Sequence, residues 1–220
     1  MKTLICIPCM DMVHTTFLRS ILGLQPTGDV RFALSASSLV YDARNTLARQ
    51  AMAENYDRVL WLDSDMDFEP DLMQRLSVDL DEGREFVASL YMTRKAPIKP
   101  TIFEACGYAH DEETGKIHNV AKCFFDYPKN QIFEIAAAGF GGVMMTVDLL
   151  RRVTEKYGLP FSPMMGYGED MSFCMRAREL GVKLYCDSRV KMGHVGTGVI
   201  SEETYEGIRN NAGSNAVKQG

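Results

Sequence analysis

Short apolar runs alternate with segments of helical periodicity from residue 3 to residue 91 of this chain. The runs predict strands at 3–8, 30–35, 58–62 and 85–91, and the periodic segments predict helices at 15–24, 39–55 and 70–80. This alternation is typical of an open, mostly parallel sheet with helices on both faces. Right-handed crossovers bring the loop after each strand to one edge, where ligands of such folds bind. We therefore expect an α/β fold with its functional site at that edge.

The pattern changes after residue 92. Short β-like pieces at 101–103, 122–125 and 132–134 are separated by glycine, proline and charged turns, which predicts a small mixed or antiparallel β insert beside the sheet. Residues 136–142 are small and predicted to be flexible, helices are expected at 147–156 and 169–180, and a strand at 182–186. We expect one domain over residues 1–210 and a flexible tail over 211–220.

Composition excludes some classes of protein. Hydrophobic residues make up 46% of the 220, which is enough for a sizeable core. The net charge of −5 argues against general nucleic-acid binding, which favours basic surfaces. No run of eighteen apolar residues is present, and the first apolar run ends at Pro8, so we expect neither an integral membrane segment nor a signal peptide.

Six cysteines are spread along the chain, and two of them, Cys6 and Cys9, form a CxxC. A redox pair is disfavoured because Cys6 lies inside an apolar run instead of at a helix start. A zinc site is disfavoured because no second CxxC or CxxH is present. We expect buried free thiols and a reducing, cytoplasmic compartment.

Three carboxylates, Asp63, Asp65 and Asp67, follow the buried strand at 58–62. They repel one another unless a positive charge lies among them, and hard oxygen donors suit Mg²⁺ or Mn²⁺. The alternatives are a solvated acidic turn, or a cap in which Asp63 and Asp67 bind the start of the next helix. The position at a strand end favours the metal site.

Two further signals lie downstream. Glu169 and Asp170 open a helix after a glycine-rich turn, where they either cap it or serve chemistry. His194 lies in the loop sequence Gly-His-Val-Gly, which suits a metal ligand better than a core residue.

In this order, the elements 5–8 (Ile-Cys-Ile-Pro), Asp63-Ser64-Asp65, Glu169-Asp170 and His194 resemble the motifs of glycosyltransferases of the GT-A fold, nearest to the family-2-like group. The segment Gly-Glu-Asp-Met-Ser-Phe-Cys-Met-Arg-Ala-Arg-Glu-Leu-Gly is close to that family's ED helix, and Ala-Arg-Asn at 43–45 also matches. The resemblance covers about residues 3–198. It implies a single GT-A (Rossmann-like) domain, with a nucleotide-binding half at 1–92 and an acceptor or catalytic half at 93–200.

On the donor side, the resemblance implies that Asp65 ligates the metal, with Asp63 on the ribose, the metal or its water shell. His194 would be a further metal ligand, and Ser64 belongs to the same nucleotide-binding motif. Pro8 and the loop after it would border the nucleobase.

The resemblance also implies that Arg44 helps to hold the nucleotide, although a helix-surface cation is the alternative. Gly141 and Gly142 match a small-residue stretch beside the donor sugar, where bulk would exclude the ring. Asp170 would be the base that deprotonates the acceptor hydroxyl in an inverting reaction, with Glu169 supporting it or binding the acceptor.

The function implied is a glycosyltransferase that depends on Mn²⁺ or Mg²⁺ and moves one sugar from a nucleotide-diphosphate sugar, a UDP-sugar in the common case, to an acceptor hydroxyl of unknown kind. A sugar-phosphate nucleotidyltransferase is the first alternative, but residues 8–14 contain no glycine-rich phosphate loop. A non-catalytic nucleotide-binding protein would be expected to have lost part of the motif set. A phosphohydrolase normally has its nucleophile after the first strand.

Overall fold

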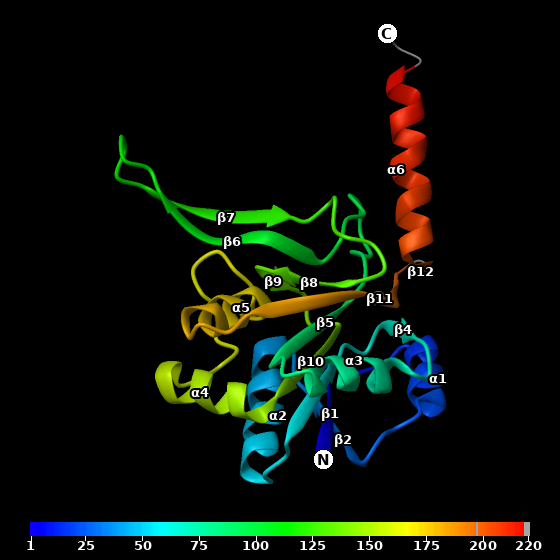
Figure 1. Cartoon of the computed structure of the whole chain (residues 1–220), viewed down its shortest axis with the longest axis vertical. Coiled ribbons are helices and arrows are strands. Elements are labelled where there is room, and N and C mark those ends of the chain that lie inside the picture. Colours follow the sequence, from blue (N-terminus) through cyan, green and yellow to red (C-terminus); the bar gives the residue numbers. More distant parts are fainter. Residues whose placement is uncertain (197, 218–220) are drawn as a thin grey trace.

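A mixed β-sheet runs through the protein, whose computed structural model describes residues 1–196 and 198–217 (Figure 1). In spatial order its strands are β12 (Val199–Ile200), β11 (Leu184–Val195), β5 (Phe86–Leu90), β10 (Gly142–Thr146), β3 (Arg58–Leu62), β1 (Lys2–Cys9) and β2 (Asp29–Ala36). β1 is parallel to β2 and β3, and β5 is parallel to β11. β10 is antiparallel to both β3 and β5, so it is the reversed strand among these neighbours. The expected α/β fold with a largely parallel sheet is therefore present.

The β insert is antiparallel. β6 (Ile102–His110) pairs with β7 (Ile117–Cys123) and with β9 (Ala137–Ala138) in a second, three-stranded sheet. Two short strands, β4 (Met66–Phe68) and β8 (Ile132–Ile135), instead pair antiparallel with β11. Figure 1 shows the β6–β7 hairpin extending away from the central sheet.

Helices cover both faces of the sheet. They are α1 (Thr15–Gly23), α2 (Val40–Ala53), α3 (Leu72–Asp81), α4 (Val147–Tyr157) and α5 (Glu169–Glu179), and a further helix, α6 (Glu202–Val217), follows β12. Successive side chains of a strand point to opposite faces, so Trp61 joins a core with Leu47 of α2 and Phe173 of α5, while Leu60 joins a core with α1 and α3. This burial on both faces explains why β3 and β5 are buried at every position and are mostly apolar.

The predicted flexible stretch at 136–142 is instead buried structure. Ala137 and Phe140 are at most 1% exposed, and β9 begins there. The residues are small because the backbone passes close to neighbours: a Cβ added to Gly141 would lie 2.8 Å from Cζ of Tyr91. Small residues here serve close packing, which sequence composition alone does not distinguish from flexibility.

The halves expected at 1–92 and 93–200 share one sheet, because β10 lies between β3 and β5. All six cysteines are free, with Cys9 and Cys106 only partly buried. Burial raises the pKa of the Cys6 thiol, as expected for an unreactive core cysteine. Among the described residues, none of the helices combines the length and apolar character needed to cross a membrane.

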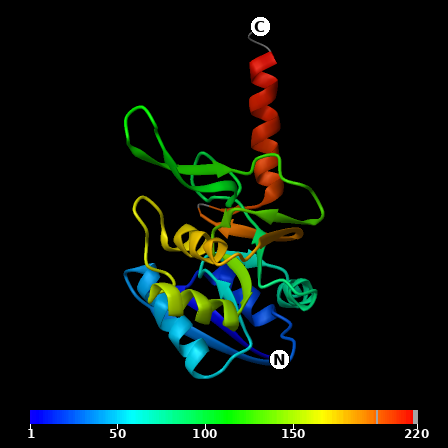
Figure 2. The same ribbon diagram turned by 60° about the vertical axis from the view of Figure 1, so that its left-hand side comes forward.

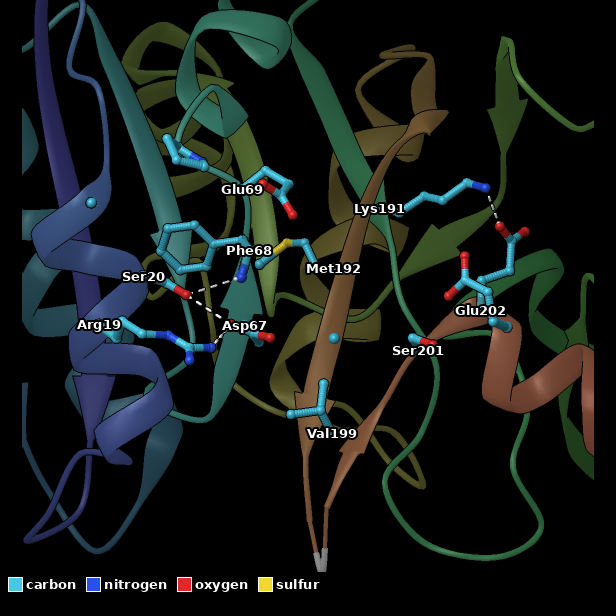
Figure 3. A pocket seen from close by; sticks show the side chains of 14 residues that line it. Arg19, Ser20, Asp67, Phe68, Glu69, Lys191, Met192, Val199, Ser201 and Glu202 are labelled. Atoms are coloured by element: carbon cyan, nitrogen blue, oxygen red, sulfur yellow. Dashed lines mark hydrogen bonds and ion pairs between the residues drawn. The ribbon is translucent and has the colours of Figure 1, made fainter.

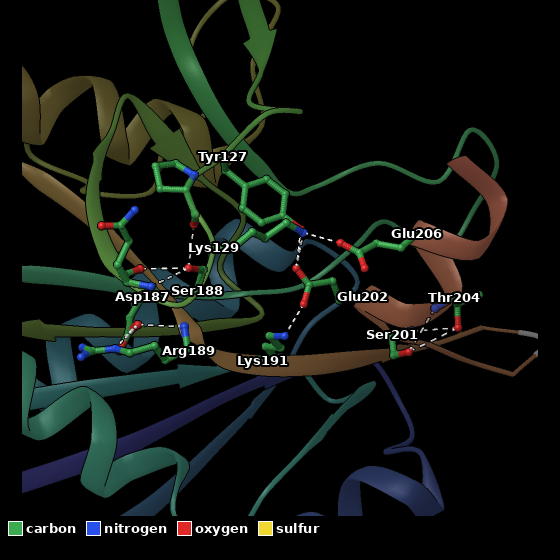
Figure 4. Close-up of polar contacts among 12 residues, drawn as sticks. Tyr127, Lys129, Asp187, Ser188, Arg189, Lys191, Ser201, Glu202, Thr204 and Glu206 are labelled. Atoms are coloured by element: carbon green, nitrogen blue, oxygen red, sulfur yellow. Dashed lines mark hydrogen bonds and ion pairs between the residues drawn. The ribbon is translucent and has the colours of Figure 1, made fainter. Parts of the chain in front are cut away.

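The last helix, α6, projects from the body in both views (Figures 1 and 2). Its first turn is anchored by Glu202, whose carboxylate receives hydrogen bonds from Tyr127 Oη at 2.6 Å and Lys129 Nζ at 2.7 Å and pairs with Lys191 (Figure 4). Acidic residues in the first turn favour a helix start. Residues 211–217 are thus helical where a tail was predicted, and 218–220 lie outside the described residues.

Candidate active site

A cleft of about 780 Å³ opens where β1, β3 and β5 end. The residues lining it include Pro8, Arg44, Asp63, Ser64, Asp65, Tyr91, Arg94, Phe140, Glu169, Asp170 and His194. Sequence reasoning had singled out eight of these positions, far apart along the chain, and the carboxyl-end edge of the sheet brings them together as the topology rule predicts.

The side chain of Arg44 contacts two of the predicted acidic residues, Asp63 and Glu169. Its Nη2 donates to Asp63 Oδ1 at 2.8 Å, and its Nε donates to Glu169 Oε1 at 3.1 Å. The side chain is 2% exposed and lies against the rings of Trp61 and Phe140. A helix-surface cation is therefore excluded, and Arg44 joins the end of β3 to the start of α5.

This network leaves one polar atom of Arg44 without a partner. Within the described residues, Nη1 is buried and makes no hydrogen bond. A buried donor without an acceptor is costly, so a water or a ligand oxygen is the natural partner of Nη1. Burial, reinforced by the charges of Asp65 and Glu169, raises the pKa of Asp63 despite its contact with Arg44.

Asp65 and His194 face each other at the mouth of the cleft. The backbone aligns them, since β4 pairs with β11 and Val195 N donates to Asp65 O at 2.8 Å. His194 Nε2 lies 3.4 Å from Asp65 Oδ2. His194 Nδ1 lies 2.9 Å from the carbonyl oxygen of Met92. Because a carbonyl only accepts, Nδ1 must carry the hydrogen, and Nε2 of the neutral ring has a free lone pair.

These facing atoms suit a divalent cation. A free lone pair directed at a carboxylate is unfavourable unless a proton or a metal lies between them. Two neighbouring ligands of an octahedral ion, each about 2.1 Å away, would be about 3.0 Å apart, close to the observed separation. A backbone carbonyl on the second ring nitrogen is the usual partner of a metal-binding histidine. The residues present therefore fit such a metal.

The predicted third ligand, Asp63, is turned to Arg44. Across residues 1–196 and 198–217, no three His, Cys, Asp or Glu side chains are grouped to hold a metal on their own. The protein would thus supply two ligands and a substrate the others, as is common for Mg²⁺.

Arg94 is a site residue that the sequence reasoning missed. It follows β5, and its Nη1 makes a close ion pair with Asp65 Oδ2, the oxygen that faces His194. Burial acts to raise the pKa of Asp65, but His194 and Arg94 outweigh it and lower that pKa. The signal was present in the sequence, since the edge rule that selected Asp63 applies equally to the residues after the strand at 85–91.

Asp170 lies partly buried in the first turn of α5. Its Oδ1 accepts a hydrogen bond from the backbone N–H of Met171 at 2.7 Å. Burial and then the negative charge of Glu169 raise the pKa of Asp170 to about 6. A carboxyl with such a pKa exchanges its proton near neutrality, as a general base must.

Gly141 and Gly142 were predicted to lie beside a donor sugar, but they do not line the cleft. A Cβ added to Gly142 would lie 2.2 Å from Sδ of Met192, deep in the sheet. Their place in the cleft wall is taken by Phe140 and by Tyr91, whose Oη accepts a hydrogen bond from Gly141 N at 3.0 Å.

A second cavity, of about 530 Å³, lies between α1, β4, β11 and the start of α6 (Figure 3). Asp67, the third carboxylate of the acidic cluster, belongs to this cavity. It accepts a hydrogen bond from Ser20 Oγ at 2.9 Å and pairs with Arg19. Asp67 thus ties β4 to α1, and the cluster divides between two sites.

Comparison with known proteins adds information on the fold. No model of a known protein family matches this chain, and no curated protein matches its sequence. In solved structures, 290 chains match its fold. One of them is the crystal structure of A197 from STIV, with a TM-score of 0.62 and 18% identity over 89% of this chain and 86% of that one. At that identity the likeness shows a shared fold, extending over nearly the whole of both chains.

Proposed function

We propose that this chain is a metal-dependent glycosyltransferase of the GT-A type that moves one sugar from a nucleotide-diphosphate sugar to an acceptor hydroxyl. The observation that supports this best is the meeting of Asp65, His194 and Asp170 in one cleft. A pair of metal ligands and a carboxyl with a pKa of about 6 are the groups that such a transfer needs.

In this proposal Asp65 and His194 hold Mn²⁺ or Mg²⁺ against the donor diphosphate. When bound, the metal neutralises the charge that develops on the departing diphosphate. Pro8 and the loop after it border the nucleobase of a UDP-sugar. The exposed side chains of Met10 and Met12 supply apolar surface along that loop.

Asp170 acts on the acceptor. Its carboxylate takes the proton of the acceptor hydroxyl, whose oxygen forms a bond to C1 of the sugar. The bond between C1 and the diphosphate oxygen breaks, and its electron pair leaves with the nucleoside diphosphate. Attack from the side opposite the diphosphate inverts the configuration at C1.

Arg44 fixes the position of the residues that bind the sugar donor relative to those that bind the acceptor. Its contacts to Asp63 and Glu169 join the donor side of the cleft to the helix that carries Asp170. Its Nη1, which has no hydrogen-bond partner in the part of the chain that the structure describes, provides a buried donor at the base of the cleft. The unpaired state of all six cysteines favours a cytoplasmic location.

The proposal is tested by a thermal-shift panel of nucleoside diphosphates and nucleotide-sugars, each with and without Mn²⁺. Binding to the folded state raises the melting temperature by mass action. We expect a rise that needs both Mn²⁺ and one nucleotide. A panel without any metal-dependent shift would contradict the proposal.

The acidic cluster supplies a matched pair of variants. Asp65→Ala should abolish Mn²⁺-dependent nucleotide binding measured by calorimetry. Asp67→Ala removes the same charge two residues away, on the side of the second cavity, and should keep that binding. Equal losses of Mn²⁺-dependent nucleotide binding in both variants would contradict the assignment of Asp65 as a metal ligand. Binding without release of nucleoside diphosphate in the wild type would favour a non-catalytic nucleotide-binding protein.

A further inference from the structure

The contact between Arg94 and Asp65 has a consequence for metal binding. Arg94 is 44% exposed in its side chain, whereas Asp65 is 24% exposed. The guanidinium therefore lies on the solvent side of the carboxylate and bonds the oxygen that faces His194. A positive charge already occupies the approach that a divalent cation would use.

Arg94 and a divalent cation cannot share Asp65 Oδ2 without a large repulsion. Both are positive, and they would lie about 4 Å apart in a partly buried site, where like charges repel strongly. Arginine cannot relieve this repulsion by losing its proton, because the guanidinium stays protonated in proteins. The side chain must leave Asp65 when the metal arrives.

The loop allows the side chain to leave while its backbone stays. The loop base is closed by Thr93 N, which donates to Lys99 O at 2.8 Å. The backbone of Arg94 also packs against Gly196, where an added Cβ would lie 3.2 Å from its carbonyl oxygen. The guanidinium carries no second ion pair among the described residues, so only one contact has to break.

The same position offers a new partner once the donor is bound. Arg94 lines the cleft beside Ser64 and Asp65, so a diphosphate on a metal held by Asp65 lies within reach of its side chain. The planar guanidinium matches two phosphate oxygens at once, which an ammonium group does not.

Resting on the proposed function, we propose that Arg94 is a positioning residue that neutralises Asp65 in the absence of substrate and moves to the donor diphosphate when the metal binds. Metal alone then binds weakly, because it must displace Arg94. Metal and diphosphate bind cooperatively, because the displaced guanidinium gains the diphosphate oxygens as partners.

The test compares Arg94→Gln with Lys95→Gln, a matched control that removes the same charge from the neighbouring exposed residue. Mn²⁺ binding without nucleotide is measured by electron paramagnetic resonance, and UDP binding in saturating Mn²⁺ by calorimetry. We expect Arg94→Gln to tighten Mn²⁺ binding about tenfold and to weaken UDP binding about tenfold, each corresponding to a modest coupling between charged sites. Lys95→Gln should change neither by more than about twofold.

Opposite signs are the signature that a merely structural role would not produce. Weaker or unchanged Mn²⁺ binding in Arg94→Gln overturns the proposal, as does unchanged UDP binding. Arg94→Lys should keep the competition with Mn²⁺ but recover only part of the UDP affinity, and full recovery would overturn the two-oxygen contact.

A failure of the proposed function gives a different result from a failure of the proposal for Arg94. If the wild type binds Mn²⁺ but no nucleoside diphosphate of the panel, the glycosyltransferase proposal fails. Tighter Mn²⁺ binding in Arg94→Gln would in that case still support competition at Asp65.

Discussion

Asp170 and Glu202 both lie in the first turn of a helix, yet their surroundings are opposite. Glu202 is 6% exposed and is met by two lysines and a tyrosine hydroxyl, so its pKa falls to about 2 although burial acts to raise it. Asp170 is also withdrawn from water, but the charged residue beside it is Glu169, and its pKa rises to about 6. Both carboxylates lie at the positive end of a helix dipole, so the neighbouring charges decide whether the pKa rises or falls.

Glu202 is a structural anchor, whereas Asp170 is the proposed general base. With a pKa lowered to about 2, Glu202 is ionised near neutral pH, and it holds α6 to β11 and to the loop before β8 (Figure 4). The ionised form of Asp170 is poorly stabilised, because the hydrogen bonds of Arg44 go to Asp63 and Glu169. Poor stabilisation of the charged form raises the pKa of a carboxyl group, so the carboxylate takes up a proton more readily.

The largest expected effect is on turnover. Asp170→Asn removes the proposed base and should lower release of nucleoside diphosphate by about 10²–10⁴-fold. Binding of UDP in Mn²⁺, followed by calorimetry, should stay within about twofold, because Asp170 is assigned no contact with the diphosphate. Glu202→Gln is the control and should keep near wild-type turnover. Turnover that survives in Asp170→Asn would show that the base has been misassigned.

The next effect is on stability at the anchor. Glu202→Gln removes a charged acceptor from Lys129, Lys191 and Tyr127, and should lower the free energy of unfolding by about 2–4 kcal/mol. Urea denaturation at pH 7 measures this as a lower midpoint. An unchanged midpoint would mean that the cluster is solvated enough to contribute nothing.

Asp170→Asn should have the opposite effect on stability. The carboxyl titrates near 3.8 when unfolded and at about 6 in the folded protein, so its ionisation opposes folding. The cost is absent below pH 3.8, grows between pH 3.8 and 6, and is complete above that. The variant should therefore gain about 1–3 kcal/mol at pH 8 and nothing at pH 3.5.

Melting curves of wild type and Asp170→Asn across this pH range provide the measurement. The loss in Glu202→Gln should behave in the reverse way: it is full above pH 4.5, the ordinary value for a glutamate, and shrinks as pH falls toward 2. Parallel pH curves for the two variants would remove the distinction between anchor and base.

The smallest effect is a slope in the pH profile. If Asp170 must be ionised to accept a proton, turnover should rise about tenfold per pH unit below pH 6 and level off above it. Initial rates between pH 4.5 and 8 at saturating donor and Mn²⁺ would show this. A profile that is flat across pH 6 would assign the proton transfer to another group.

Much of the fold could be predicted from local pattern. The alternation of apolar runs and helical segments predicted β1, β2, β3 and β5 and the helices between them. The signal is clearest in β1, β3 and β5, because these strands are buried on both faces. The direction of β10 could not be predicted, because a short apolar run carries no sign of its orientation. Nor could the helix α6 be distinguished from a tail, because its partners are distant in sequence: Glu202 contacts Lys129 and Tyr127, which lie 73 and 75 residues earlier.

The sequence by itself determined which residues are candidates for the chemistry, because carboxylates after a buried strand and a histidine between glycines are poor choices for any core. Only the tertiary structure decided their partners. Asp63 accepts a hydrogen bond from Arg44, and Arg94 forms an ion pair with Asp65. Gly141 and Gly142 are closely packed inside the protein instead of lining the cleft. The physical reason is that a side chain's charge and size are local properties, whereas its neighbours depend on the pairing of strands far apart in sequence.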